Sequence, residues 1–400
     1  MPHGAASVAN VTVRRVPTLG RAVTIVYGAR VLRCLAYGAL SVIFGITLAD
    51  RGFAPTLVGG VMSLALLSGA VSSAVSGAVV KRVGFRATLL IAAALMVLAP
   101  LAFALNSILA LACAVLAGTL SPGGQEVGPF SALEQVFIAD ASTADVRVKR
   151  YAAYNLLGAL SLAVGALVGG LVTRNVVLVG YSCCGAALLV LYAHLPSVAS
   201  PIRVSKKRPR PSSDNVIVQL TALFGLDAFA GGFIVQGFLA YWLHLRFGTS
   251  AAAIGVVLFL ANVLAASSYL VADRVAAKIG LIRTMVYTHL PSNIVLCIVP
   301  LMPTFESATA ALLLRFAFSQ MDVPTRQAFT MNLVAPQDRA YAAGVTSAVR
   351  PAAAAFGPVL AGVALQHAGS GLPFFLSGGL KIVYDVLVYA RFKGHSTSVD

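Results

Sequence analysis

The chain of 400 residues is strongly apolar, with 58% hydrophobic residues, 10% charged residues and a mean hydropathy of +0.88. A soluble globular protein carries about 25% charged residues, so this composition excludes a chain whose whole surface faces water. The net charge of +16 does not indicate a nucleic-acid partner. Its Lys and Arg residues fall in short gaps between apolar runs, without a basic stripe interleaved with exposed aromatics. We therefore expect a protein embedded in a lipid bilayer.

Twelve apolar runs are long enough to cross the hydrocarbon core as helices, which takes about 20 residues each. In the first half of the chain they cover residues 24–49, 56–80, 87–105, 107–138, 151–173 and 175–195. In the second half they cover residues 217–245, 251–272, 284–302, 306–335, 340–366 and 371–392. The pattern predicts an all-α membrane protein with twelve transmembrane helices.

The charges between the runs orient the predicted helices. With the N-terminus in the cytoplasm, twenty Lys and Arg residues fall on the cytoplasmic side, and only Arg51, Arg174 and Arg246 fall on the other. Basic residues favour the cytoplasmic side of a membrane, so a bias sustained over twelve runs supports both the count and the orientation. We expect both termini to be cytoplasmic, in a bacterial inner or plasma membrane.

The two halves of the chain repeat one another around a basic, proline-rich segment at 196–216. Lys81–Arg86 and Lys278–Arg283 follow the second run of each half, and Tyr151 and Tyr341 open the fifth. We expect a cytoplasmic arm at 1–23, a six-helix bundle at 24–195, the linker at 196–216, a second bundle at 217–392 and a cytoplasmic tail at 393–400. Such parallel repeats place a transport site at their interface.

Two sequence motifs make the resemblance to a known family explicit. The segment Gly77–Arg86 is similar to the signature that the major facilitator superfamily carries between its second and third helices, although Lys81 stands where the family has an acid. Gly165–Gly170 resembles the antiporter signature of the fifth helix, with Ala166 in place of proline. The resemblance implies two pseudo-symmetric six-helix bundles, a small-molecule substrate and a functional monomer. The second motif favours export, although small residues also serve close helix packing.

Charged and polar residues inside the predicted spans mark candidate site positions. A charge at the bilayer centre costs at least about 2.5–3.5 kcal/mol, so each needs a partner, water or a proton. In the family, the first and fourth helices of each half line the central cavity. The candidates for the substrate and proton pathway fall on those helices, and are Arg33, Glu126, Glu134, Asp227, Gln236, Arg315, Asp322 and Arg326.

The fourth span contains several glycines and prolines and is predicted to be broken at membrane depth. Broken helices line water or substrate, and burial favours the protonated form of a carboxyl group. We therefore interpret Glu126 or Glu134 as a proton carrier; the alternative is that they neutralise Arg33.

The other spans give three further expectations. Arg315, Asp322 and Arg326 form one stripe on a continuous helix, with Asp322 exchanging partners or protons; the alternative is a static ion pair. Asp227 and Gln236 share a face and contact substrate. Lys381 and Asp385, four residues apart, form a structural ion pair within their helix.

The sequence shows no catalytic residue set. It has no phosphate-binding Walker loop, no nucleophile elbow and no His-Glu-x-x-His helix, and its five cysteines lack the spacing of a metal site. We expect no enzyme activity, no metal and no cofactor. The leading interpretation is a secondary active transporter of a small organic solute, coupled to protons and favouring export. The alternatives are a passive facilitator, or a membrane enzyme or sensor that transports nothing.

Overall fold

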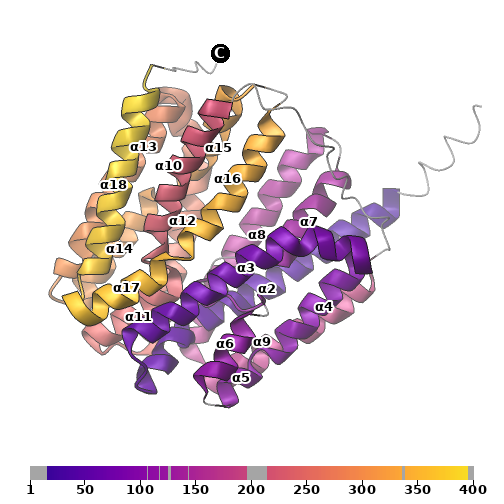
Figure 1. The fold of residues 1–400 in the computed structure, drawn as a ribbon, viewed down its shortest axis with the longest axis horizontal. Helices are drawn as coiled ribbons and strands as arrows, with labels where there is room; N and C mark the ends of the chain where they lie inside the picture. Colours follow the sequence, from indigo (N-terminus) through magenta and orange to yellow (C-terminus); the bar gives the residue numbers. More distant parts are fainter. Residues whose placement is uncertain are drawn as a thin grey trace, which may run out of the picture.

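The computed structural model describes residues 16–105, 107–116, 118–124, 128–142, 144–195, 214–335 and 338–394. Throughout this part of the chain the regular structure is α-helical, apart from one short 3-10 helix. Figure 1 shows two groups of helices side by side, α2–α9 in one and α10–α18 in the other.

The first bundle is built from the first half of the chain. Its helices are α2 (Val16–Asp50), α3 (Pro55–Val83), α4 (Phe85–Leu98), α5 (Leu101–Ala104), α6 (Ile108–Leu116), α7 (Pro129–Asp140), α8 (Ala144–Leu171) and α9 (Arg174–Ala193). The long α2 packs along α8 and α9, and α4 packs on α9.

The second bundle repeats this plan. Its helices are α10 (Asp214–Gly232), α11 (Gln236–Phe247), α12 (Ala251–Ile279), α13 (Leu281–Ile298), α14 (Phe305–Phe318), α15 (Asp322–Leu333), α16 (Arg339–Ala354), α17 (Gly357–Ala368) and α18 (Leu372–Phe392). The 3-10 helix η1 (Val299–Leu301) extends α13. Here α10 packs on α16 and α18, and α14 packs on α12 and α13.

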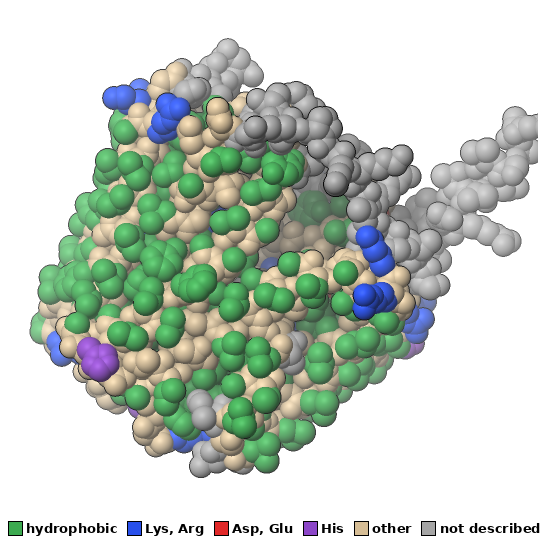
Figure 2. All heavy atoms as spheres, in the orientation of Figure 1, with side chains coloured by type: hydrophobic (Ala, Val, Ile, Leu, Met, Phe, Trp, Pro, Cys, Tyr) green, Lys and Arg blue, Asp and Glu red, His purple; other side chains and the backbone are tan. Residues whose placement is uncertain are grey.

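Ten helices in the described residues are long and apolar enough to cross a membrane. The fourth and tenth predicted spans are not in that set, since their helices α6, α7, α14 and α15 have 9, 12, 14 and 12 residues and none is long enough to cross alone. Figure 2 shows hydrophobic side chains spread over the flanks of both groups, as lipid contact requires. The structure is therefore consistent with twelve crossings.

Two spans that the sequence predicts as continuous helices are broken. The span 217–245 divides between α10 and α11, and the span 340–366 divides between α16 and α17. The two breaks lie against each other, because a Cβ on Gly232 would collide with the carbonyl of Ala354, and one on Gly357 with Gly232. The missing side chains let the two backbones touch, and Pro358 at the start of α17 has no N–H to continue the preceding helix.

Within the first bundle, glycines bring α8 against α2. A Cβ on Gly165 would collide with the carbonyl of Leu35, and one on Gly169 with the carbonyl of Ala39. The segment that resembles the antiporter signature therefore serves close helix packing, as small residues do in membrane interfaces.

The bundles contact each other near one end of the molecule. The contacting helix pairs are α2 with α11, α3 with α17 and α8 with α12. Gly59 lies against Pro358, Gly362 against Pro55, and Gly170 against Ala251 and Gly255. Most of these positions lie on the helix halves that border the connections at 51–54, 172–173, 248–250 and 369–371, and Pro358 lies at the other end of α17, next to the break at 355–356. We call this end the sealed side.

At the opposite end, where the described chain reaches Gly394, the bundles separate. Figure 2 shows a hollow between the group that contains α16 and the group that contains α3 and α7. The close approaches of glycine backbones between bundles described above lie away from this end. We call it the open side, and the structure is that of a molecule closed on one side only.

Candidate functional site

A buried ion pair joins α2 to α7 inside the first bundle. Arg33 Nη1 and Nη2 donate to the two carboxylate oxygens of Glu134 at 2.8 and 2.7 Å. The hydroxyls of Tyr154 and Tyr192 donate to the same oxygens at 2.8 and 2.6 Å. The Arg33 guanidinium lies 4.8 Å from the ring centroid of Phe130, and both Arg33 and Glu134 are 0% exposed. We call Arg33, Glu134, Tyr154 and Tyr192 the Glu134 cluster.

The break in the fourth span sets the position of Glu134. The chain runs without helix through the described residues 118–124, and α7 starts at Pro129 after Gly128, which has φ +149°. That conformation suits glycine, and the proline ring suits the first turn of the new helix. Glu134 then lies in the second turn of α7, facing Arg33. Glu126 lies outside the described residues.

Each oxygen of Glu134 accepts two hydrogen bonds, so the carboxylate is saturated with donors. A proton added to either oxygen would have to displace one of them. Removing one partner of a buried pair costs about 3–5 kcal/mol, because the other charge is left uncompensated. The geometry of Glu134 therefore corresponds to the neutralisation of Arg33, the alternative that the sequence left open.

A larger cluster surrounds Asp227 of α10 in the second bundle. Lys381 Nζ of α18 donates to Oδ1 at 2.6 Å, while Nη1 of Arg326 and Nη1 of Arg350 donate to Oδ2 at 3.1 and 3.2 Å. Arg326 Nη1 also donates to Asp322 one turn earlier, at 2.8 Å. We call Asp227, Asp322, Arg326, Arg350 and Lys381 the Asp227 cluster. One carboxylate thus pairs with cations from three different helices.

The predicted stripe of Arg315, Asp322 and Arg326 is only partly present. Asp322 and Arg326 form the expected i,i+4 pair on α15. Arg315 is separated from them because α14 ends at Phe318 and α15 begins at Asp322. The residues between the helices change the direction of the chain before Pro324 is reached. The helix therefore breaks earlier than the proline alone suggests.

The intrahelical pair predicted for Lys381 and Asp385 is not the arrangement found. Lys381 reaches across to Asp227, whereas Asp385 accepts from His289 Nδ1 at 2.8 Å and from Asn293 Nδ2 at 2.9 Å. Lys381 of α18 contacts Asp227 of α10, and Asp385 lies against α13. The interaction of both residues is therefore between helices.

Gln236, predicted to contact substrate beside Asp227, lies at the start of α11, beyond the break that ends α10. Its amide nitrogen donates to Ser41 Oγ at 2.8 Å, and its amide oxygen accepts from Asn262 Nδ2 at 2.9 Å. Ser41 belongs to the first bundle, so Gln236 ties the bundles together across the interface. The break removes the shared helix face on which the prediction relied.

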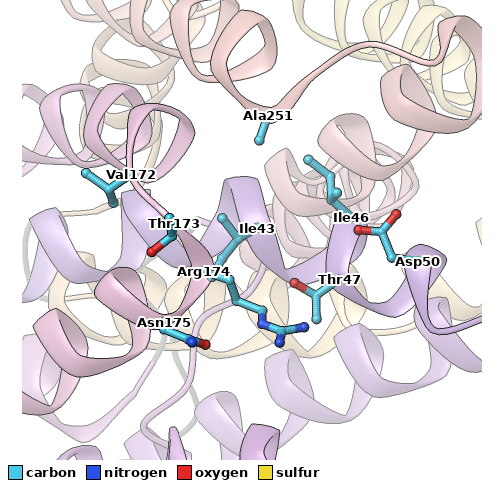
Figure 3. A pocket seen from close by; sticks show the side chains of 9 residues that line it. All are labelled: Ile43, Ile46, Thr47, Asp50, Val172, Thr173, Arg174, Asn175 and Ala251. Atoms are coloured by element: carbon cyan, nitrogen blue, oxygen red, sulfur yellow. The ribbon is translucent and has the colours of Figure 1, made fainter.

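A small pocket of about 370 Å³ opens on the sealed side. Figure 3 shows the labelled side chains around it, with Arg174 directed toward Thr47 and with Asp50 nearby at the end of α2. His244 of α11 lies 3.3 Å from Asp50 and so connects the second bundle to the first. This pocket is separate from the Glu134 and Asp227 clusters.

Four residues of the two clusters and their surroundings were not singled out as site residues from the sequence: Tyr154, Tyr192, His289 and Arg350. Each lies within an apolar run, and its partner comes from another helix. The usable signal was the polar residue itself at membrane depth, which nearly always has a partner.

The family model of the Major Facilitator Superfamily matches residues 26–321. This covers more than half of the chain, and the protein belongs to that superfamily. It is a membrane transporter rather than an enzyme.

Particular relatives were found by sequence and by structure. Uncharacterized membrane protein YJR124C of Saccharomyces cerevisiae is 24% identical over 424 residues, covering 94% of each chain. The human organic anion transporter MFSD10 is 17% identical with a TM-score of 0.67, covering 92% of this chain and 99% of its own. A D-xylose–proton symporter is 15% identical with a TM-score of 0.71, covering 92% and 97%. At such identities the two structural likenesses establish the fold alone.

Proposed function

We propose that this transporter moves a small organic solute by secondary active transport, with its two bundles rocking against each other so that the sealed side and the open side exchange. The observation that carries the proposal is the asymmetry between the two ends. The bundles meet through close glycine contacts at one end and leave a hollow at the other. A binding site between two such bundles is exposed to one side at a time, which is the geometry of alternating access.

The direction that the open side faces follows from loop charge. The ends of α3, α12 and α18 that face the open side carry Lys81, Lys278 and Arg391 in their last turns, and basic residues at helix ends favour the cytoplasm. The proposed state is therefore inward-facing, with the linker 196–216 and both termini cytoplasmic. The bacterial inner membrane remains a prediction, and the matching curated relative is a yeast protein.

Proton coupling is proposed at Asp322 rather than at Glu134. Arg326 Nη1 is shared between Asp322 and Asp227, at 2.8 and 3.1 Å. A proton on Asp322 would release Arg326 wholly to Asp227, so a protonation event would change the pairing between α15 and α10. Glu134 lacks this freedom because four hydrogen bonds already occupy its two oxygens. The similarity to a D-xylose–proton symporter supports the idea of coupling only at the level of the fold.

The test is solute flux in proteoliposomes with and without a pH gradient. Wild-type protein is expected to show counterflow of a solute and a net flux that follows the gradient. Asp322→Asn is expected to retain counterflow and to lose the dependence on the gradient. Gradient-driven flux that persists in Asp322→Asn would remove Asp322 as the coupling acid, and Glu126→Gln is the next variant to measure.

A passive facilitator is the second candidate. It is favoured by the saturated state of Glu134, since the acid predicted as a proton carrier has the geometry of a structural partner. Flux that equilibrates solute and ignores the pH gradient in the wild type would support it. The resemblance of Gly165–Gly170 to an antiporter signature favours export. A comparison of solute uptake by right-side-out and inside-out vesicles would test the direction of transport.

A further inference from the structure

Two polar side chains, one in the last turn of α14 and one on the residue that follows the helix, have buried atoms with no hydrogen-bond partner. Arg315 Nε and Ser319 Oγ are both in this state, and Ser319 follows Arg315 by four residues, which is one helical turn. On the neighbouring α13, Asn293 Oδ1 also has no hydrogen-bond partner, although the amide nitrogen of Asn293 donates to Asp385. Buried polar atoms are nearly always satisfied, so such a group points to a missing ligand or water.

The position of Arg315 on α14 directs it into the protein rather than into lipid. The lipid face of the helix is marked by Leu314 and Phe318, which are 53% and 43% exposed. Arg315 instead shares a flank with Leu312 and Ser319, which are buried. Arg315 therefore lies on the side of α14 that faces the interior of the second bundle, where its backbone carbonyl accepts from Ser292 Oγ of α13 at 3.3 Å.

Asp227, the shared acid of this bundle, already accepts from three cations other than Arg315: Lys381, Arg326 and Arg350. Among the described residues, the ion pairs of this bundle's interior do not include Arg315, whose guanidinium contacts the ring of Phe316 at 4.9 Å. Counting Arg315, Arg326, Arg350 and Lys381 against Asp227, Asp322 and Asp385 leaves one positive charge in excess, before any proton on His289 is counted.

We propose that the transported solute is an organic anion, and that its acidic group binds between Arg315 Nε and Ser319 Oγ at the C-terminal end of α14. This inference rests on the proposed function and specifies its substrate class. An anion accepts hydrogen bonds from both donors and cancels the excess charge, whereas a cation would add to it. A neutral solute would satisfy the hydrogen bonds and leave the charge unbalanced.

The test compares anions with neutral amides of the same shape. The purified full-length protein is heated in detergent at constant ionic strength with benzoate or succinate, and separately with benzamide or succinamide. The anions are expected to raise the melting temperature and the amides are not, because a ligand of the folded state stabilises it by mass action. Equal shifts from acid and amide, or no shift from either anion, would overturn the proposal.

Variants locate the binding group. Arg315→Gln is expected to weaken anion binding by roughly tenfold to a hundredfold, the range for losing a charged hydrogen bond. Arg315→Lys keeps the charge and should retain part of the affinity, and Ser319→Ala should weaken binding less than Arg315→Gln. Arg391→Gln, which removes an exposed arginine that contacts Gln219, is the matched control and should leave binding unchanged.

Flux distinguishes this proposal from the proposed function. If proteoliposomes transport a solute and Arg315→Gln binds and transports anions like the wild type, the proposed anion site is wrong and the proposed transport function is retained. If no solute shows counterflow in the wild type although anions bind, the transport mechanism is wrong and the anion site stands. Unaltered anion binding in folded Arg315→Gln contradicts the site under either result.

Discussion

The two buried charge clusters occupy comparable places in the two bundles, yet they are built differently. In the Glu134 cluster one acid meets one arginine and two tyrosine hydroxyls, and both charged side chains are fully buried. In the Asp227 cluster three cations share one acid, and the Arg350 side chain is 31% exposed. An ion pair whose hydrogen-bonding sites are all occupied is suited to hold helices together. An acid that pairs with three cations can lose one of them and remain neutralised. The comparison assigns rigidity to the first cluster and rearrangement to the second.

The largest expected effect is on the rigid cluster. Glu134→Gln leaves Arg33 buried with no counter-charge, and should lower the free energy of unfolding by about 3–5 kcal/mol. The measurement is thermal unfolding of purified protein. The double variant Arg33→Leu with Glu134→Leu should recover much of the loss, because an apolar pair removes both buried charges. A double variant as unstable as Glu134→Gln would show that the pair does more than neutralise itself.

A second prediction concerns the close contact between α3 and α17, which holds the two bundles together on the sealed side. Gly59→Val places a side chain against the backbone of Pro358 and should disfavour the sealed state by about 1–3 kcal/mol. Gly60 has open space where its side chain would go, so Gly60→Val is the matched control. Ser63 Oγ accepts a hydrogen bond from the backbone N–H of Val359 on the sealed side. The rate at which a thiol reagent labels a cysteine introduced at Ser63 therefore measures how often this side opens. Equal labelling in the two valine variants would contradict the assigned seal.

The same elements show which features of the fold and the site could be predicted from the sequence. The spans, the split of the fourth span and the Asp322–Arg326 pair follow from local pattern, because length, glycine, proline and i,i+4 spacing are local properties. The breaks at residues 233–235 and 355–356 were missed, since they depend on one backbone touching another. The partners of Lys381 and Asp385 were missed for the same reason. Pairing between helices depends on how the helices pack, and one sequence does not contain that information in readable form.

A smaller effect is expected in the cluster that rearranges. Arg350→Gln leaves Lys381 and Arg326 on Asp227, and the side chain is partly exposed, so the stability cost should stay within about 1 kcal/mol. Transport should nevertheless fall, because one of the exchangeable partners is gone. A stability loss as large as that of Glu134→Gln would erase the difference between the two clusters.

The smallest effect is expected on the sealed side, at the contact between Asp50 and His244. Their side chains are 62% and 25% exposed, so Asp50→Asn should change the stability of the seal by less than about 1 kcal/mol. Cysteine labelling at Ser63 in Asp50→Asn and in the wild type measures it. A change as large as that expected for Gly59→Val would contradict this ranking.

The most direct test of the account is the distance between the bundles at each end. It is measured by double electron–electron resonance between spin labels attached to introduced cysteines, in a variant that lacks the native cysteines. One pair, at Arg86 and Arg283, reports the open side, and another, at Asn175 and His367, reports the sealed side; all four positions are exposed. Rocking predicts that conditions which shorten the first distance lengthen the second, so that each pair shows two populations in opposite proportion. A single unchanged distance at both ends, during measured flux, would contradict alternating access.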